Sequence, residues 1–328
     1  MNAQRATELV PLLLELTEEF CIELRAHILE VASERGGRAI LGTVQDRPET
    51  EDVHAEIDRA CEERFWSKCQ EFEARGLRVW IISEHHPEGY GHDEPNVICQ
   101  IDPFDGTDQF LRGIWEAWYS VFSFTTPRGQ VLVGGCVDLI SGLLYFADAV
   151  NKRVWQVYLP SGKRTEVFPS QETKLSGKSV VASYKGKWRY LAPWAIMVQD
   201  YLSREEFAGI THYSWGGSFV YALLAAGVFS VYIMTREPTD EIRPGRAYVA
   251  AAGLRLYSVS EEGILRLFRW TQKSRVTFFI AAPNRELAQS VVDGIWGRDE
   301  EAVREQRGWL ARSLRFLSRP RMRQLNPS

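Results

Sequence analysis

Hydrophobic and polar positions along the first part of the chain predict helices followed by strands. Between residues 6 and 33 apolar residues recur at helical spacing, which predicts an amphipathic helix covering a sheet with Leu9, Leu12, Leu13, Leu16 and Phe20. A polar, glycine-containing loop separates it from a second helix expected over about Val53 to Ala74. The runs "LRVWIISE" and "NVICQID" then predict two short strands that end in carboxylates, Glu84 and Asp102.

The direction of these two strands decides whether their acids meet. If both run the same way in one sheet, Glu84 and Asp102 finish at the same edge, where sheets of this type place ligands. The connection between them is short for a parallel crossover, so the pattern leaves the direction open. From Tyr119 to Val157 four apolar runs separated by turn residues predict an antiparallel meander.

The second half of the chain alternates helices and strands. A polar stretch at 160–178 is the best boundary candidate. Beyond it we expect strands in "SVVASY", "VFSVYIM" and "VTFFIAA", and helices in "WRYLAPWAIMVQDYL", "SFVYALLAAG" and "RAYVAAAGLRLYS". We therefore divide the chain into an α+β half at 1–170, an α/β half at 171–298 and a charged helix with a basic tail at 299–328.

Composition narrows the classes of partner. The net charge of −4 over 328 residues gives no basic excess of the kind that nucleic-acid binding requires. No apolar run reaches the length of a membrane span, and no charged-then-apolar leader opens the chain. Five cysteines without a C-x-x-C pair predict a reduced, cytoplasmic protein. Small molecules or other proteins are the expected partners.

The segment "DPFDGT", residues 102–107, carries the strongest chemical signal. Asp, Pro and Gly are ordinary turn residues, but that explains each one separately and not the ordered set. We expect a tight turn that aims the oxygens of Asp102 and Asp105 at one point, with Gly106 allowing a ligand to approach the backbone. Thr107 would begin a helix running through Phe110 and Ile114, so that free N–H groups face the same point. Such an arrangement is typical of a site for a metal and a phosphate.

Electrostatics requires a cation at this point. Two carboxylates about 4 Å apart repel by about 4 kcal/mol at an effective dielectric constant of about 20. Adding Glu84 without compensation would increase this cost or force protonation. Because hard oxygen ligands favour Mg²⁺ over softer metals, Mg²⁺ is the expected cofactor.

These residues resemble the inositol monophosphatase family of Mg²⁺-dependent, lithium-sensitive phosphatases. "DPFDGTDQF" is similar to the family's D-P-[IL]-D-G-T signature, and four further segments follow the family order. They are "EDVHAEIDRACEERF", "ISEHH", "VGGCVDLISGLLYFA" and "WGGSFVYALLAAG", so that the resemblance covers about residues 10 to 295. It implies a layered α/β/α/β/α sandwich, hydrolysis of a small phosphorylated polyol, sugar or nucleotide by a metal-activated water, and a possible homodimer.

The resemblance also implies roles for individual residues. The metal ligands would be Glu84, Asp102, the carbonyl of Phe104, and Asp105. Asp58 and Thr107 would together orient and deprotonate the attacking water. On the substrate side, the N–H groups of Gly106 and Thr107 would hold the phosphate, and Gly217 and Ser218 would lie beside the alcohol.

Three departures from the family pattern affect these expectations. Matching the second-half motif W-D-x-A-x-A-G to this chain puts Tyr248 or Arg246 where a metal-binding aspartate belongs, so this acid is expected to be missing. A threonine of the family's V-T-x-x-D segment is Ala55, and a glutamate that binds inositol hydroxyls is Met234. The last change argues against myo-inositol phosphate as the substrate.

The missing acid leaves two classes of function open. As an enzyme, the chain could use Arg246 in place of a second metal at the phosphate, or Asp240 or Glu241 could reach in from the longer loop. The alternative is a weak or inactive relative that binds a phosphorylated metabolite or a partner protein. The intact pair of Asp58 and Thr107 favours the enzyme, because a pure binder has little use for it.

Overall fold

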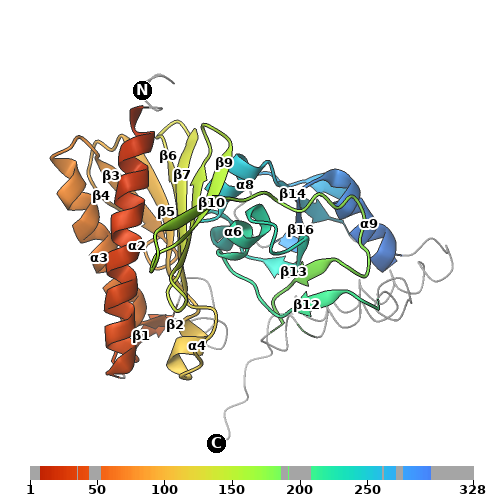
Figure 1. Ribbon diagram of the computed structural model, residues 1–328, viewed down its shortest axis with the longest axis horizontal. Coiled ribbons are helices and arrows are strands. Elements are labelled where there is room, and N and C mark those ends of the chain that lie inside the picture. Colours follow the sequence, from red (N-terminus) through yellow and green to blue (C-terminus); the bar gives the residue numbers. More distant parts are fainter. Residues whose placement is uncertain are drawn as a thin grey trace, which may run out of the picture.

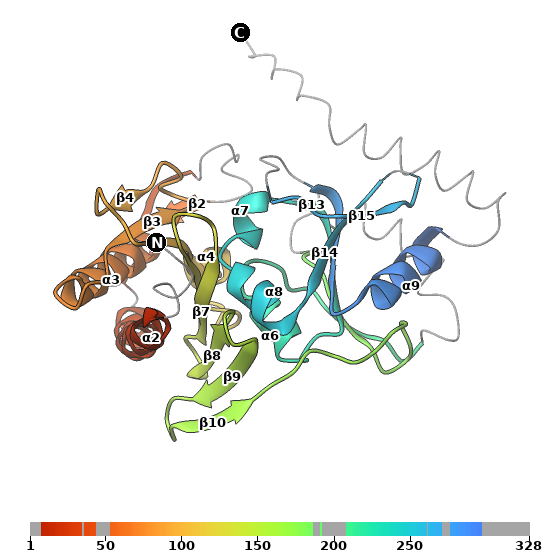
Figure 2. The ribbon, with the colours of Figure 1, turned by 90° about the horizontal axis from the view of Figure 1, so that it is seen from above.

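Five alternating layers of helix and sheet make up the protein (Figure 1). A computed structural model describes residues 8–34, 36–43, 53–185, 191, 208–260, 262–270 and 276–296. Two long helices cover one face of a large sheet, short helices fill the space between this sheet and a smaller one, and a last helix covers the far side (Figures 1 and 2). The expected layered α/β fold is confirmed. The helix expected over 188–202 and the segment 299–328 fall almost wholly outside the described residues.

The large sheet has eight strands in the order β10-β9-β8-β7-β6-β5-β3-β4. They are β3 (Val79–Ser83), β4 (Tyr90–Gly91), β5 (Val97–Asp105), β6 (Tyr119–Thr125), β7 (Val131–Asp138), β8 (Leu143–Asp148), β9 (Arg153–Tyr158) and β10 (Lys163–Glu166). Strands β6 to β9 form the predicted antiparallel meander, and β10 extends it into the polar stretch expected as a boundary. Every residue of β6 is buried, because helices pack on both faces of the sheet.

Strands β3 and β5 run parallel, which settles the direction that the sequence left open. The short strand β4 pairs on the outer side of β3 and accounts for the brief connection between them. In the parallel register Ser83 lies opposite Ile101. The next positions along both strands are Glu84 and Asp102, so the register itself brings these acids to one edge.

Two helices cover the outer face of the large sheet, α2 (Val10–Ser33) and α3 (Glu56–Glu73), close to their predicted bounds. A two-stranded sheet of β1 (Ile40–Thr43) and β2 (Val53–Ala55) comes directly before α3. Three buried phenylalanine rings join the layers: Phe20 of α2 lies 4.9 Å from Phe65 of α3 and 5.6 Å from Phe122 of β6, between ring centroids. This aromatic cluster holds both helices against the sheet that carries the site.

The smaller sheet has six strands in the order β12-β11-β13-β16-β14-β15. They are β11 (Val180–Ala182), β12 (Thr211–Tyr213), β13 (Val231–Glu237), β14 (Arg255–Val259), β15 (Leu265–Leu267) and β16 (Val276–Ala282). Its helices are α6 (Val220–Ala225), α7 (Thr239–Ile242), α8 (Arg246–Ala252) and α9 (Arg285–Trp296). Helices α6 and α8 lie between the two sheets, and α9 covers the other face (Figure 2).

One predicted helix in this half is wrong over its second part. The run "RAYVAAAGLRLYS" is helical only to Ala252, and Arg255 begins strand β14. Gly253 has a φ of 70°, the left-handed conformation that commonly ends a helix. Gly253 therefore ends the helix, and the sequence prediction failed because the apolar pattern continues past this glycine.

None of the helices that the structure describes has both the length and the apolar character that crossing a membrane would need. All five cysteines are buried and free, so the described core holds no disulfide.

We expect Phe20→Ala to lower the free energy of unfolding by about 3–5 kcal/mol, because it removes a ring from the fully buried cluster and leaves a cavity. Urea denaturation followed by circular dichroism measures this change. Ile22→Ala on the same helix is the control, since Ile22 is half exposed and its loss should cost less than about 0.5 kcal/mol. Equal losses for both variants would show that the aromatic cluster does not hold the helix.

Candidate active site

Asp102 and Asp105 lie on strand β5 rather than on the expected tight turn. Residues three apart on a regular strand face opposite sides of the sheet, which would separate the two acids. The pairing of β5 with β6 contains an irregularity here, with Asp102 opposite Val121 and Asp105 opposite Tyr119. Three steps along β5 thus match two along β6, as in a β-bulge, and Pro103 inside it has no N–H to pair. The extra residue turns both carboxylates toward the same pocket.

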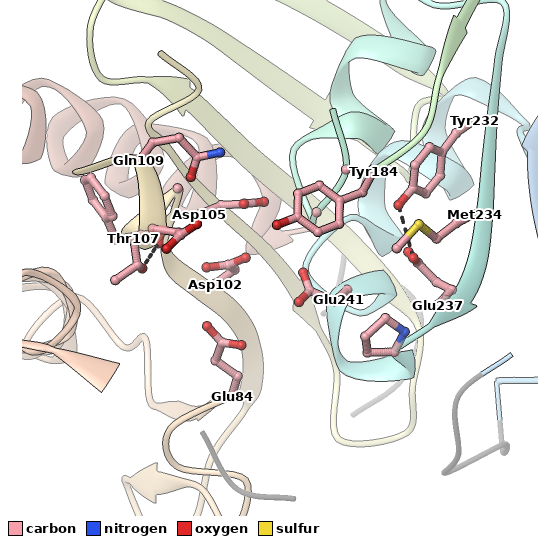
Figure 3. Close-up of a pocket in the computed structure, with 16 residues that line it drawn as sticks. Glu84, Asp102, Asp105, Thr107, Gln109, Tyr184, Tyr232, Met234, Glu237 and Glu241 are labelled. Atoms are coloured by element: carbon pink, nitrogen blue, oxygen red, sulfur yellow. Dashed lines mark hydrogen bonds between the residues drawn. The ribbon is translucent and has the colours of Figure 1, made fainter. Parts of the chain in front are cut away.

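The pocket is an open cavity of about 110 Å³ between the two sheets, room for several water-sized groups. Figure 3 shows the acidic side chains reaching into it from different segments. Its lining comes from both halves: Glu84, Asp102, Phe104, Asp105, Gly106, Thr107, Asp108, Gln109, Tyr184, Gly216, Gly217, Tyr232, Met234, Glu237, Pro238 and Glu241. The expected metal ligands Glu84, Asp102, Phe104 and Asp105 are therefore brought together.

A fourth acid, Glu241, completes the cluster from the second half of the chain. Asp102, Asp105 and Glu241 each offer one carboxylate oxygen, and these three atoms all lie within 4.8 Å of one another. Glu241 is one of the two acids, Asp240 and Glu241, that were expected to reach in from a longer loop, and it lies on the short helix α7. A carboxylate thus stands beside Asp102 and Asp105 where the motif match predicted none.

The two residues that the motif match put in the place of this acid lie elsewhere. The hydroxyl of Tyr248 is fully buried and donates to the carbonyl of Tyr145, at 2.9 Å. Arg246 donates from Nη2 to the carbonyl of Gly129, at 3.1 Å, and its guanidinium lies over the ring of Trp270. The expectation that Arg246 contacts the phosphate is corrected, because its fork is turned to another segment and it does not line the pocket.

Thr107 and Asp58 form a buried hydrogen-bonded pair at the wall of the pocket. The hydroxyl of Thr107 donates to Asp58 Oδ1 at 2.8 Å (its Oγ1 is also 3.0 Å from the carbonyl of Phe104), and Asp58 Oδ2 accepts the backbone N–H of Ala55 at 2.6 Å. The bond to Asp58 Oδ2 comes from the backbone N–H of residue 55. It therefore does not depend on the side chain there and is present although Ala55 stands where the motif has a threonine. Asp58 is thereby fixed at the start of α3, and Thr107 carries its oxygen to the pocket.

Glycines let backbone segments approach the acids closely. Gly106 has a φ of 120°, and a Cβ there would lie 2.2 Å from the carbonyl oxygen of Ala117. Gly217 has a φ of 119°, and a Cβ there would lie 2.4 Å from Asp105 Oδ2. The N–H of Phe219 donates to the same oxygen, at 3.3 Å. No residue with a side chain fits at either position without displacing the neighbouring segment.

Ser218 supports the site from behind instead of lining it. Its side chain is fully buried, and its hydroxyl donates to the backbone carbonyl of Glu241, at 3.0 Å. Gly217 lines the pocket, as expected, but Ser218 is not among the lining residues. The structure places this serine as a support for α7.

The electrostatics of the pocket indicate a missing positive charge. Burial raises the pKa of Asp102 well above its ordinary value, the charges of Asp105, Glu84 and Glu241 raise that pKa further, and contact with Ser218 offsets only part of the rise. Its Oδ1 is buried and has no hydrogen-bond partner. A buried carboxylate in this state is costly unless a cation compensates it. The donor set, all oxygen and strongly negative, fits a hard divalent cation such as Mg²⁺.

Comparison with known proteins gives matches in structure only. No family model and no curated protein sequence matches this chain. Among solved structures, the extragenic suppressor protein suhB from Bartonella henselae aligns with a TM-score of 0.61 and 16% identity, over 88% of this chain and 99% of that one. The IMPase from Thermotoga maritima aligns with 0.59 and 16%, over 88% and 98%.

Inositol monophosphatase II from Staphylococcus aureus aligns with a TM-score of 0.59 and 14% identity, over 90% of this chain and 98% of that one. This chain therefore has the inositol monophosphatase fold, and the match covers nearly the whole length of these proteins. At such identities the likeness establishes the fold, and the activity has to be argued from the site itself.

Sequence reasoning missed two residues that line the pocket from the second half of the chain, Tyr184 and Glu237. Tyr184 is the last residue of the expected strand "SVVASY", Glu237 lies beyond the expected strand "VFSVYIM", and no motif marks either of them. Tyr184 belongs to the second half of the chain, and Figure 3 shows its hydroxyl pointing toward the acids of the first half. For Glu241 a signal existed, because an acid four residues beyond a buried strand end is a candidate ligand at a sheet edge.

We expect Asp102→Asn to stabilise the cation-free protein at neutral pH. Because the pKa of Asp102 is raised in the folded state, that state holds the proton more tightly than the unfolded chain does. The contribution of Asp102 to wild-type stability is then greatest at low pH and falls as the pH rises from the ordinary pKa of 3.8 through the raised one. The asparagine carries no charge to bury, so its advantage in melting temperature, measured in a chelator, should widen with rising pH.

Asp148→Asn is the matched control for this experiment. Asp148 is equally buried, but its carboxylate accepts hydrogen bonds from the backbone N–H groups of Val150 and Asn151, at 3.0 and 2.9 Å. Its replacement should therefore destabilise the protein. A lower melting temperature for Asp102→Asn than for wild type at neutral pH in the chelator would contradict the electrostatic analysis.

Proposed function

We propose that the protein is a Mg²⁺-dependent phosphomonoesterase acting on a small phosphorylated polyol, sugar or nucleotide. The observation that carries this proposal is the meeting of Asp102, Asp105 and Glu241 within 4.8 Å, in a pocket that also holds Glu84 and Thr107. These residues come from both halves of the chain, and the acids supply the oxygen ligands that Mg²⁺ prefers. The inositol monophosphatase fold supports the same class of reaction.

The cation would be held by Glu84, Asp102, Asp105, Glu241 and the carbonyl of Phe104. All five line the pocket, and the buried, partnerless Oδ1 of Asp102 fits a ligand atom. When bound, divalent cations supply the positive charge that attracts phosphoryl oxygens and lowers the pKa of water. Without them this acidic pocket would repel a phosphate.

Thr107 and Asp58 would handle the attacking water. Asp58 Oδ1 accepts the hydroxyl hydrogen of Thr107, so the lone pairs of Thr107 Oγ1 are left to accept a hydrogen bond from a water in the pocket. The water then points its own lone pair at the phosphorus, and its proton leaves toward the Thr107–Asp58 pair. The N–H groups of Gly106 and Thr107 would bind phosphate oxygens.

The substrate side argues against myo-inositol as the alcohol. Met234 lines the pocket and offers a thioether where hydroxyl recognition needs a stronger acceptor. We therefore propose a different small alcohol and expect little activity on myo-inositol phosphate. The alternative function, binding without turnover, gains no support from a buried, fully formed Asp58–Thr107 bond.

Thr107→Ala should lower kcat by about 10²- to 10⁴-fold, because it removes the group that orients the water, while Mg²⁺ half-saturation changes little. Release of inorganic phosphate from sugar phosphates, fructose bisphosphate and adenosine 3′,5′-bisphosphate measures this, with and without Mg²⁺.

Thr17→Ala is the control, since it removes an equally buried hydroxyl from α2, far from the pocket, and should leave kcat unchanged. Asp102→Asn should abolish Mg²⁺-dependent release. Equal rates of phosphate release by wild type and Asp102→Asn on every substrate would contradict the enzyme proposal.

A further inference from the structure

Glu237, the last residue of β13, is a buried acid that the proposed chemistry does not use. Only 1% of its surface is exposed, yet it stands at the wall of a pocket that already holds four other acids with a ligand role. Burying one more carboxylate beside them is unfavourable unless it is firmly hydrogen-bonded. Its presence therefore calls for a physical reason.

Two tyrosines hold this carboxylate. The hydroxyl of Tyr221, on α6, donates to Glu237 Oε1 at 2.9 Å. The hydroxyl of Tyr232, on β13, donates to Glu237 Oε2 at 3.0 Å, a bond drawn as a dashed line in Figure 3. Both rings are fully buried, and burial and the charge of Glu237 raise the pKa of each phenol. The phenols consequently stay protonated and act as donors. We call these three residues the carboxylate clamp.

The backbone around the clamp is held in an unfavourable conformation. Arg236, directly before Glu237, has a φ of 61°, a left-handed value that is rare for a residue with a long side chain. Such strain persists only where the surrounding structure enforces it, and it gathers at functional sites. The clamp is the buried interaction adjacent to this strained step.

Helix α7 begins two residues beyond the clamp. Pro238 restricts the backbone between Glu237 and Thr239, and Glu241 follows four residues after Glu237. The carbonyl of Glu241 is also held, by the hydroxyl of Ser218. A four-residue helix cannot maintain its own position, so its place depends on the burial of Thr239 and Ile242 and on these attachments at either end.

We propose that Glu237 is a positioning residue that, through the carboxylate clamp, fixes α7 so that the carboxylate of Glu241 meets Asp102 and Asp105. This inference rests on the proposed function, since it assigns Glu237 to the cation-binding arrangement. A purely structural role would be met as well by an apolar residue, because buried charges seldom add stability over good apolar packing. The clamp instead supplies direction: two bonds from two elements set the angle at which the chain enters α7.

Glu237→Gln tests the proposal, because it keeps the size of the side chain but replaces one carboxylate oxygen with an NH₂ group. One of the two tyrosine hydroxyls then meets a donor and loses its acceptor. We expect the Mg²⁺ concentration for half-maximal phosphate release to rise by about 10- to 100-fold, the usual effect of losing a group that orients a metal ligand. At saturating Mg²⁺, kcat should return to within about threefold of wild type. Calorimetric titration with Mn²⁺ should show the same weakening without substrate.

Tyr248→Phe is the matched control, because it removes the hydroxyl of another fully buried tyrosine, one that donates to the carbonyl of Tyr145. Its Mg²⁺ dependence should stay at the wild-type value. If Glu237→Gln does not fold, Tyr232→Phe removes one bond of the clamp, keeps the ring, and should shift Mg²⁺ dependence in the same direction.

The outcomes separate this inference from the proposed function. Wild type that binds Mn²⁺ while Glu237→Gln binds it equally well would overturn the inference alone. A raised KM for substrate at unchanged Mg²⁺ dependence would also overturn it, and would make Glu237 a substrate contact. Wild type that binds no Mn²⁺ would remove the proposed function and the inference together.

Discussion

Repulsion among carboxylates is the constraint on which the rest of the site depends. Glu84, Asp102, Asp105 and Glu241 line one pocket, and Asp102 is buried with one oxygen lacking a partner. At the separations found here, each close pair of charges costs on the order of a few kcal/mol at an effective dielectric constant of about 20. The folded chain therefore carries an electrostatic cost that a bound divalent cation would relieve, and cation binding would add to its stability.

Three devices of the fold impose this arrangement on the chain. The parallel register of β3 and β5 puts Glu84 beside Asp102, and the bulge around Pro103 turns Asp105 to the same side. The segment that follows β13 brings Glu241 across from the other half. Each device belongs to a different level of structure, and the packed aromatic layer behind the large sheet keeps them in a fixed relation.

Much of this could be predicted from local patterns. The long amphipathic helices, the meander and the acidic motif at residues 102–107 are properties of short segments, and the Asp58–Thr107 bond followed from the motifs. The bulge was read as a turn, because both use Pro and Gly. For the fourth acid the motif match left three candidates, Arg246 as a substitute and Asp240 or Glu241 as acids reaching in, and the structure selects Glu241, which meets its partners only through long-range packing. The clamp around Glu237 left no local signal at all. The homodimer and the cytoplasmic location stay predictions.

The most direct measurement is a crystal structure of the protein soaked with Mn²⁺ and inorganic phosphate, with anomalous scattering used to locate the cations. The central claim predicts at least one cation between Asp102 and Asp105, with Glu84 or Glu241 among its ligands and a phosphate oxygen in contact with it. Crystals that show no cation at these carboxylates in millimolar Mn²⁺, or a phosphate bound away from them, would contradict it.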